Sequence, residues 1–357
     1  MATTMSQEQI MFFLSITSNA GSDITGSGIG AKVNAEIQKK LDILNTQSDS
    51  NWSIVWGAGL FQNNPGGVLD NTMYAAFNPD YMGKPTYFIS VAGTNASSTF
   101  DWLTEDLDTS TVVQWPYSKT KANISKGISI GLSKLVAMQP EKGLPGASQT
   151  LNTFLSKNLS QYDEYTLITG GHSLGGALSP LVALWLKDTQ STWDKDSKVT
   201  DFQSWPSAGQ TPGLENFTTY YNSQIPKTQR IFNSLDVVPH AFNKDTLEAA
   251  KTLYTPEINS YTVDLLIDLR LYKIDPLIYT QIATTDYELT GVLNKEIIDH
   301  LPLFDTVNYF KQMVYQHVEA YFKLLDVDYD AEQVNKDATV ALNNLIAYAK
   351  KHAKDLS

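Results

Sequence analysis

The sequence contains no cysteine, which excludes disulfide bridges, a cysteine nucleophile and cysteine-ligated zinc. Arginine is also scarce, since Arg230 and Arg270 are the only two. The 26 basic residues are outnumbered by 38 acidic ones, which gives a formal net charge of −12. Nucleic-acid binding depends on basic side chains that contact phosphates. This charge balance therefore argues against a nucleic-acid partner.

Membrane-spanning and secretion signals are missing as well. No apolar run approaches the ~20 residues that a transmembrane helix needs. The first 30 residues contain one apolar cluster, at 11–14, and no basic residue before Lys32. This is not the pattern of a Sec signal peptide. We therefore expect a soluble protein that is either cytoplasmic or exported by a non-Sec route, of unknown oligomeric state.

The central part of the chain alternates between two kinds of segment. Residues 165–169, 201–205 and 229–233 are short apolar runs typical of strands, whereas 174–187 and 213–222 have the length and spacing of helices. Strands that alternate with helices indicate a mainly parallel sheet with helices on its faces. The sequence therefore predicts an α/β fold.

The pattern Gly-x-Ser-x-Gly occurs twice, centred on Ser129 and on Ser173. It marks a nucleophile elbow only where a strand precedes it and a helix follows, because the sharp turn lifts the serine hydroxyl above the sheet edge. Ser173 lies between a predicted strand and a predicted helix, whereas the polar stretch 118–123 precedes Ser129. We predict that Ser173 is a nucleophile and that Ser129 lies on a helix surface.

Around this elbow, Gly-His-Ser-Leu-Gly-Gly-Ala, the sequence resembles the class 3 lipases. The resemblance extends to four other segments, namely Phe88-Ile-Ser-Val-Ala-Gly-Thr94, Asp101-Trp-Leu, Trp205-Pro-Ser-Ala-Gly209 and Ile231-Phe-Asn-Ser-Leu-Asp236. In the first segment, Ala92 stands where the family has arginine. The resemblance implies an α/β-hydrolase fold with a lid or cap insertion. It also implies hydrolysis of acyl esters, chiefly acylglycerols at a lipid–water interface, without a metal or organic cofactor.

On this basis we divide the chain into three parts. Residues 1–50 are expected to form an N-terminal helical extension, and 51–325 the α/β-hydrolase catalytic domain. Within that domain, the apolar residues of 243–302 do not recur at a regular helix or strand spacing, and this segment is expected to be a cap insertion. Residues 326–357 are expected to contain a C-terminal helix.

A serine hydrolase needs a carboxylate that orients its histidine, and α/β-hydrolases supply these groups in the order Ser, Asp/Glu, His. Asp236 follows the predicted strand 229–233, and loops at the carboxyl ends of parallel strands gather at one edge of the sheet. The alternative is a loop aspartate that caps a turn before Pro239. Position and resemblance together favour Asp236 as the acid.

Five histidines are candidates for the base. His172 lies inside the elbow and is expected to support it. His240 follows the predicted acid too closely in sequence, and His352 belongs to a lysine-rich helix near the C-terminus. Of the other two, His317 is favoured, because its surroundings Tyr-Gln-His-Val-Glu-Ala-Tyr resemble the family's ending. His300 is kept as the alternative base.

The oxyanion hole is expected to use two backbone N–H groups, those of Leu174 and Thr94. Two segments are candidates for a cover over the site. Residues 95–115 interleave apolar and acidic side chains, which fits either a lid or a packed surface helix. The apolar residues of 243–302 fit either the wall of an acyl pocket or an anchor for a decoration.

Two rival functions remain open at this stage. A phospholipase A1 or lysophospholipase activity would use the same nucleophile, although scarce arginine disfavours a phosphate clamp. A lipase-like protein that binds lipid or signals without turnover is the other rival.

Overall fold

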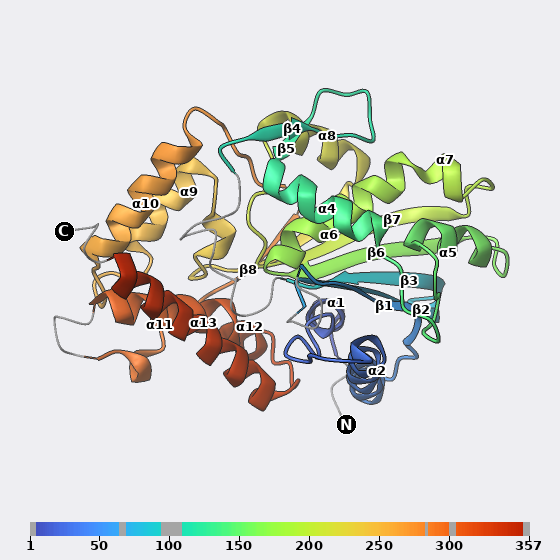
Figure 1. Ribbon diagram of the computed structural model, residues 1–357, viewed down its shortest axis with the longest axis horizontal. Coiled ribbons are helices and arrows are strands. Elements are labelled where there is room, and N and C mark those ends of the chain that lie inside the picture. Colours follow the sequence, from blue (N-terminus) through green and yellow to red (C-terminus); the bar gives the residue numbers. More distant parts are fainter. Residues whose placement is uncertain (1–4, 64–68, 94–108, 283–284, 300–304, 353–357) are drawn as a thin grey trace.

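The computed structural model describes residues 5–63, 69–93, 109–282, 285–299 and 305–352 (Figure 1). The described strands of the central sheet are β1 (Ser53–Phe61), β2 (Asn71–Tyr81), β3 (Lys84–Val91), β6 (Tyr165–His172), β7 (Val199–Ser207), β8 (Lys227–Asn233) and β9 (Thr285–Leu289). They lie in the order β1-β2-β3-β6-β7-β8-β9. The five strands from β3 to β9 are parallel, and β1 and β2 add an antiparallel edge. The predicted mainly parallel sheet is confirmed.

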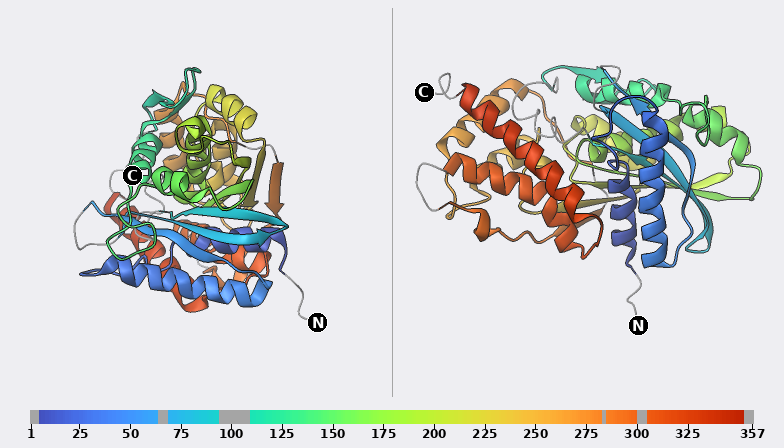
Figure 2. Two further views of the ribbon diagram at one scale, coloured as in Figure 1. Left: turned by 90° about the vertical axis from the view of Figure 1, so that its right-hand side faces the viewer. Right: turned by 60° about the horizontal axis from the view of Figure 1, so that its bottom comes forward.

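Helices cover both faces of this sheet (Figures 1 and 2). One face carries α4 (Lys126–Ala137), α5 (Leu151–Asn158), α6 (Leu174–Asp188), α7 (Gln190–Trp193) and α8 (Glu215–Gln224), and the other carries α1 (Gln7–Thr17) and α2 (Ile29–Ser48). Successive side chains of a strand point to opposite faces. In β3, Tyr87 and Ile89 accordingly join the core beneath α6, while Phe88 joins the core above α1.

The apolar cluster at 11–14 lies in α1, whose side chains Met11, Phe12 and Phe13 are fully buried. The helix begins with a capping box, in which the Ser6 side chain accepts from Gln9 N–H and the Gln9 side chain accepts from Ser6 N–H. It packs beneath β6, the strand that leads to the elbow, and beneath its neighbours β3 and β7. The first helix of the chain is therefore part of the core that supports the site.

The stretch 243–302, expected to be a cap, contributes elements to the main sheet and to a separate apolar cluster. Its strand β9 pairs in parallel with β8 at the edge of the main sheet. Its helices α9 (Lys244–Ala249) and α10 (Tyr261–Ile274) join a separate apolar cluster with α11 (Asp305–His317) and α13 (Ala331–His352). Helix α11 ends at His317, and a second helix, α12 (Glu319–Leu324), begins after Val318.

Most of the lid candidate, 95–108, lies outside the described residues. Its described end contains β4 (Val112–Gln114), which pairs with β5 (Asn123–Ser125). Trp115 is fully buried and donates a hydrogen bond of 2.7 Å from Nε1 to Oδ2 of Asp188. This end of the segment is therefore packed core.

In the part of the chain that the structure describes, no helix combines the length and the apolar character needed to cross a membrane.

Candidate active site

Ser173 occupies a sharp turn between β6 and α6. Its φ of +61° is a conformation that residues with a Cβ rarely adopt. The turn is closed by backbone contact, because a Cβ added at Gly171 or Gly175 would collide with the backbone of Val91 in the neighbouring strand. The Ser173 N–H donates to the Ser207 carbonyl at 3.0 Å. The strand–turn–helix context predicted for this serine is present.

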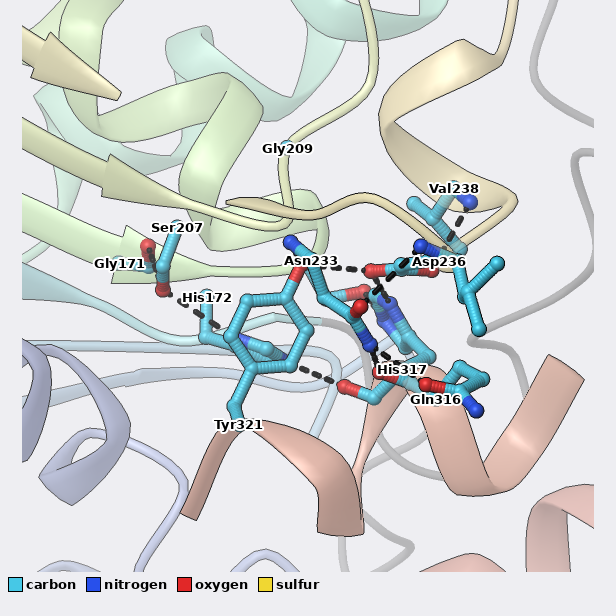
Figure 3. A network of polar contacts seen from close by, with 12 residues as sticks. Gly171, His172, Ser207, Gly209, Asn233, Asp236, Val238, Gln316, His317 and Tyr321 are labelled. Carbon is cyan, nitrogen blue, oxygen red and sulfur yellow. Dashed lines mark hydrogen bonds and ion pairs between the residues drawn. The ribbon is translucent and has the colours of Figure 1, made fainter. Parts of the chain in front are cut away.

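Three side chains from distant parts of the sequence meet at this turn. Nε2 of His317 lies 2.8 Å from Oγ of Ser173, and Nδ1 of the same ring lies 2.8 Å from Oδ2 of Asp236. Asp236 and His317 are shown in Figure 3. Exposed fractions are 6% for Ser173, 1% for His317 and 0% for Asp236. The described residues thus bring together the serine, histidine and aspartate that the sequence singled out.

The hydrogen-bond partners define the proton positions on the His317 ring. A carboxylate only accepts, so Nδ1 carries the proton and donates to Asp236. Nε2 is then a lone-pair acceptor that faces the hydroxyl of Ser173. In this tautomer the imidazole is placed to remove the serine proton, while the carboxylate stabilises the imidazolium that results.

Two further donors stabilise the negative charge of Asp236. The Val238 N–H donates to Oδ1 at 3.0 Å, and the Tyr321 hydroxyl donates to Oδ2 at 2.8 Å (Figure 3). Burial and the nearby Asp236 charge hold the pKa of Tyr321 well above its ordinary value, so this phenol stays protonated. In the sequence, Tyr321 is only the last residue of the motif around His317 that resembles the lipase family, and its contact with Asp236 is visible only in three dimensions.

The turn after β3, the candidate oxyanion turn, lies next to Ser173. Gly93 follows β3, and a Cβ built on it would lie 3.3 Å from Cβ of Ser173 and 3.7 Å from N of Leu174. The Gly93 N–H donates to Oδ1 of Asn19 at 3.1 Å. Leu174 is the first residue of α6, where N–H groups lack helical acceptors. The second predicted donor, Thr94, lies outside the described residues.

The remaining candidates occupy other positions. Ser129 lies half-buried inside α4, as the helix prediction required. Burial lowers the pKa of His240, whose Nε2 has no hydrogen-bond partner within the described ranges. His352 ends α13, and His300 lies outside the described residues. Across those ranges no group of three or more His, Asp or Glu side chains is placed to hold a metal ion.

The apolar residues of 243–302 divide into two sets. Tyr254, Leu266 and Tyr279 are buried in a cluster that also contains Val238 and residues of α11. Other members face solvent, with exposed fractions of 83% for Tyr272 and 69% for Ile278. The buried set anchors the insertion to the elements that carry Asp236 and His317.

Known proteins resemble this chain in sequence and in fold. The sequence model described as lipase (class 3) matches residues 88–246. The crystal structure of M37 lipase is 29% identical, with a TM-score of 0.79 over 94% of this chain and 98% of that chain. Lipase II from Rhizopus niveus is 16% identical, with a TM-score of 0.45 over 68% and 77% of the two chains.

A further solved structure, the native propeptide complex of Rhizomucor miehei lipase, is 18% identical, with a TM-score of 0.44 over 68% of each chain. A search of curated proteins finds no match. The predicted resemblance and the predicted α/β-hydrolase fold are confirmed by the first two findings, the family segment and the M37 lipase structure.

Proposed function

We propose that this chain, which matches the class 3 lipase model over residues 88–246 and resembles M37 lipase in fold, hydrolyses acyl esters, chiefly acylglycerols, through an acyl-enzyme on Ser173. The observation that carries the proposal is the continuous contact from Ser173 through His317 to Asp236, with both links at 2.8 Å. M37 lipase, which is similar over nearly the whole chain, is itself named a lipase.

Acylation begins when Oγ of Ser173 attacks the ester carbonyl carbon and its proton moves to Nε2 of His317. The carbonyl oxygen becomes an oxyanion, which the N–H groups of Leu174 and Thr94 stabilise. The imidazolium then gives its proton to the leaving alkoxide, and the alcohol departs. Asp236 stays ionised throughout and balances the charge of the imidazolium.

Deacylation repeats these steps with water. His317, neutral again, removes a proton from a water molecule, whose oxygen attacks the acyl carbon. The same two N–H groups stabilise the second oxyanion. Collapse of that intermediate returns the proton from His317 to Oγ of Ser173 and releases the fatty acid.

The direct test measures hydrolysis of p-nitrophenyl esters from short to long chain, above and below substrate solubility. Ser173→Ala should lower kcat by about 10⁴-fold or more with the fold preserved. Ser129→Ala, in the same sequence pattern within α4, is the matched control and should stay near wild type. If the Ser129 variant is the inactive one, the nucleophile assignment is wrong.

A second experiment concerns the base and the non-catalytic rival. His317→Ala should abolish turnover, while His300→Ala should not. A fluorophosphonate should label wild-type protein at Ser173 and fail to label the Ser173→Ala variant. Folded wild-type protein that neither reacts with the probe nor hydrolyses any ester would favour a lipid-binding role instead.

A further inference from the structure

The base lies at an interruption between two helices. α11 ends at His317 and α12 begins at Glu319. The last carbonyls of a helix have no helical donor, so they need partners from elsewhere when they are buried. Here those partners are side chains. The Gln316 carbonyl accepts from Nδ2 of Asn233 at 2.9 Å, and the His317 carbonyl faces Nε2 of His172 at 3.0 Å (Figure 3).

Both donors come from strand ends. His172 ends β6 and Asn233 ends β8, and these parallel strands have their carboxyl ends at the same edge of the sheet. Two strand ends therefore bind the backbone at the end of α11.

Asn233 connects the base to the acid. Its side chain is fully buried, with Nδ2 on the Gln316 backbone and Oδ1 accepting from the Leu235 N–H at 3.1 Å. Leu235 directly precedes Asp236, and Gln316 directly precedes His317. One amide side chain thus bridges the residue before the acid and the residue before the base.

His172 makes its contact as a neutral ring. Burial, and secondarily the neighbouring His317, keep its pKa well below the ordinary value. A neutral imidazole carries one N–H, and the His317 carbonyl can only accept, so that proton lies on Nε2. Nδ1 then faces the Ser207 hydroxyl at 3.1 Å, whose single proton is shared with the Gly171 carbonyl at 3.2 Å. A neutral ring adds no positive charge beside the imidazolium that forms on His317, whose ring centre lies 5.0 Å away.

We propose that Asn233 and His172 are positioning residues, which hold the imidazole of His317 between Asp236 and Ser173 by binding the two backbone carbonyls at the end of α11. The proposal rests on the proposed function, since it assigns His317 the role of base. Geometry is the reason for a catalytic effect: a misplacement of about 1 Å can cost on the order of 10²-fold in rate.

The first test compares two substitutions of His172. In His172→Gln, the side-chain NH₂ can take the place of Nε2–H, whereas His172→Leu fills similar space without a donor. We expect kcat to fall about 10- to 100-fold in the leucine variant and to recover to within about threefold of wild type in the glutamine variant. Equal activity of the two variants, with both folded by circular dichroism, would overturn the role of His172.

The second test compares two buried amides. Asn233→Leu removes the donor to the Gln316 carbonyl. Gln312→Leu, one turn earlier in α11, removes an amide that binds the Asn294 backbone and accepts from Nε2 of Gln316 at 3.3 Å, but it leaves the donors of both carbonyls at the helix end in place. Both variants should lose stability, but only Asn233→Leu should lower kcat and shift the acid limb of the pH profile. Matching kinetic losses in both would indicate a general packing effect and overturn the proposal.

A substrate-free readout separates this proposal from the proposed function. The proton between Nδ1 of His317 and Asp236 should give a low-field NMR signal in wild-type protein, the Gln312→Leu variant and the His172→Gln variant. It should weaken or move upfield in the His172→Leu and Asn233→Leu variants. If wild type hydrolyses no ester, the proposed function fails while this comparison still reports on positioning. An unchanged signal in both leucine variants at the strand ends would overturn the positioning roles.

Discussion

The hydroxyl of Tyr321 donates a 2.8 Å hydrogen bond to Oδ2 of Asp236, the same oxygen that accepts the Nδ1 proton of His317 at 2.8 Å. Tyr321 lies in α12, one helical turn beyond the base, so the interruption after His317 places both side chains on one carboxylate. The phenol therefore competes with the imidazole for the charge of Asp236.

Removing the phenol should make that carboxylate a stronger partner for the imidazolium. We expect Tyr321→Phe to move the acid limb of kcat/KM to higher pH by about half a unit to one unit. The loss of a hydrogen bond to a buried charged group should lower the free energy of unfolding by about 1.5–3 kcal/mol. Rate–pH profiles and urea unfolding measure the two effects.

Tyr309→Phe is the matched control for this substitution. Tyr309 is also buried, and its hydroxyl donates to the Ala250 carbonyl at 2.7 Å, away from Asp236. This variant should lose stability without a shift in the pH profile. Identical pH shifts in the two variants would contradict the link between Tyr321 and the base.

The backbone of Ser173 gives a prediction about stability. A φ of +61° costs a residue with a Cβ about 1–3 kcal/mol, whereas glycine adopts it freely. Ser173→Gly and Ser173→Ala both delete the hydroxyl and should both be inactive. The free energy of unfolding of the glycine variant should nevertheless be about 1 kcal/mol higher than that of the alanine variant. The glycine variant should therefore unfold at a higher urea concentration. Equal or lower stability of the glycine variant would show that the elbow is unstrained in solution.

The sequence was sufficient for those features that depend on local pattern. The elbow around Ser173 needs a strand, a turn with glycines and a helix in consecutive order, and the sequence pattern predicts all three. The α/β alternation and the edge position of Asp236 follow in the same way. Chain order and the resemblance of the motif around it predict His317.

Other parts depend on contacts between distant segments and carry no local signal. Asn233 and Gln316 are 83 residues apart, and neither amide differs in sequence from an ordinary surface residue. Strand β9 lies in a stretch whose apolar residues have no regular spacing. Pairing with β8 therefore decides the conformation of β9. The interruption between α11 and α12 falls inside a helical pattern, where the strand-end side chains compensate for the lost helical bonds.

Buried neutral His172 gives a prediction about pH. Its folded pKa lies well below the unfolded value of about 6.5, so below that pH the unfolded chain binds a proton that the folded chain does not. Stability should therefore be complete above about pH 6.5 and should fall with decreasing pH by up to ~1.4 kcal/mol per pH unit from this group. His172→Gln should flatten the curve between about pH 6.5 and pH 5, measured by urea unfolding. A slope equal to wild type would contradict the burial of a neutral ring.

The last prediction concerns the contact between the N-terminal segment and the oxyanion turn. Oδ1 of Asn19 accepts the Gly93 N–H at 3.1 Å, and Gly93 lies against Ser173 and Leu174. Since the proposed second oxyanion donor, Thr94, follows Gly93, we expect loss of this bond to weaken stabilisation of the oxyanion. Asn19→Leu leaves the Gly93 N–H without its acceptor and lets the turn move.

The effect should fall on the transition state, because the oxyanion forms only there. We expect kcat of Asn19→Leu to fall about 10- to 100-fold with KM nearly unchanged, which steady-state kinetics on a soluble ester measures. Asn19→Asp keeps an acceptor oxygen at this position and should retain most of the wild-type kcat. A rise in KM with kcat unchanged would place Asn19 in substrate binding, and equal losses in both variants would show that the side chain acts through its amide and not through the acceptor that Gly93 uses.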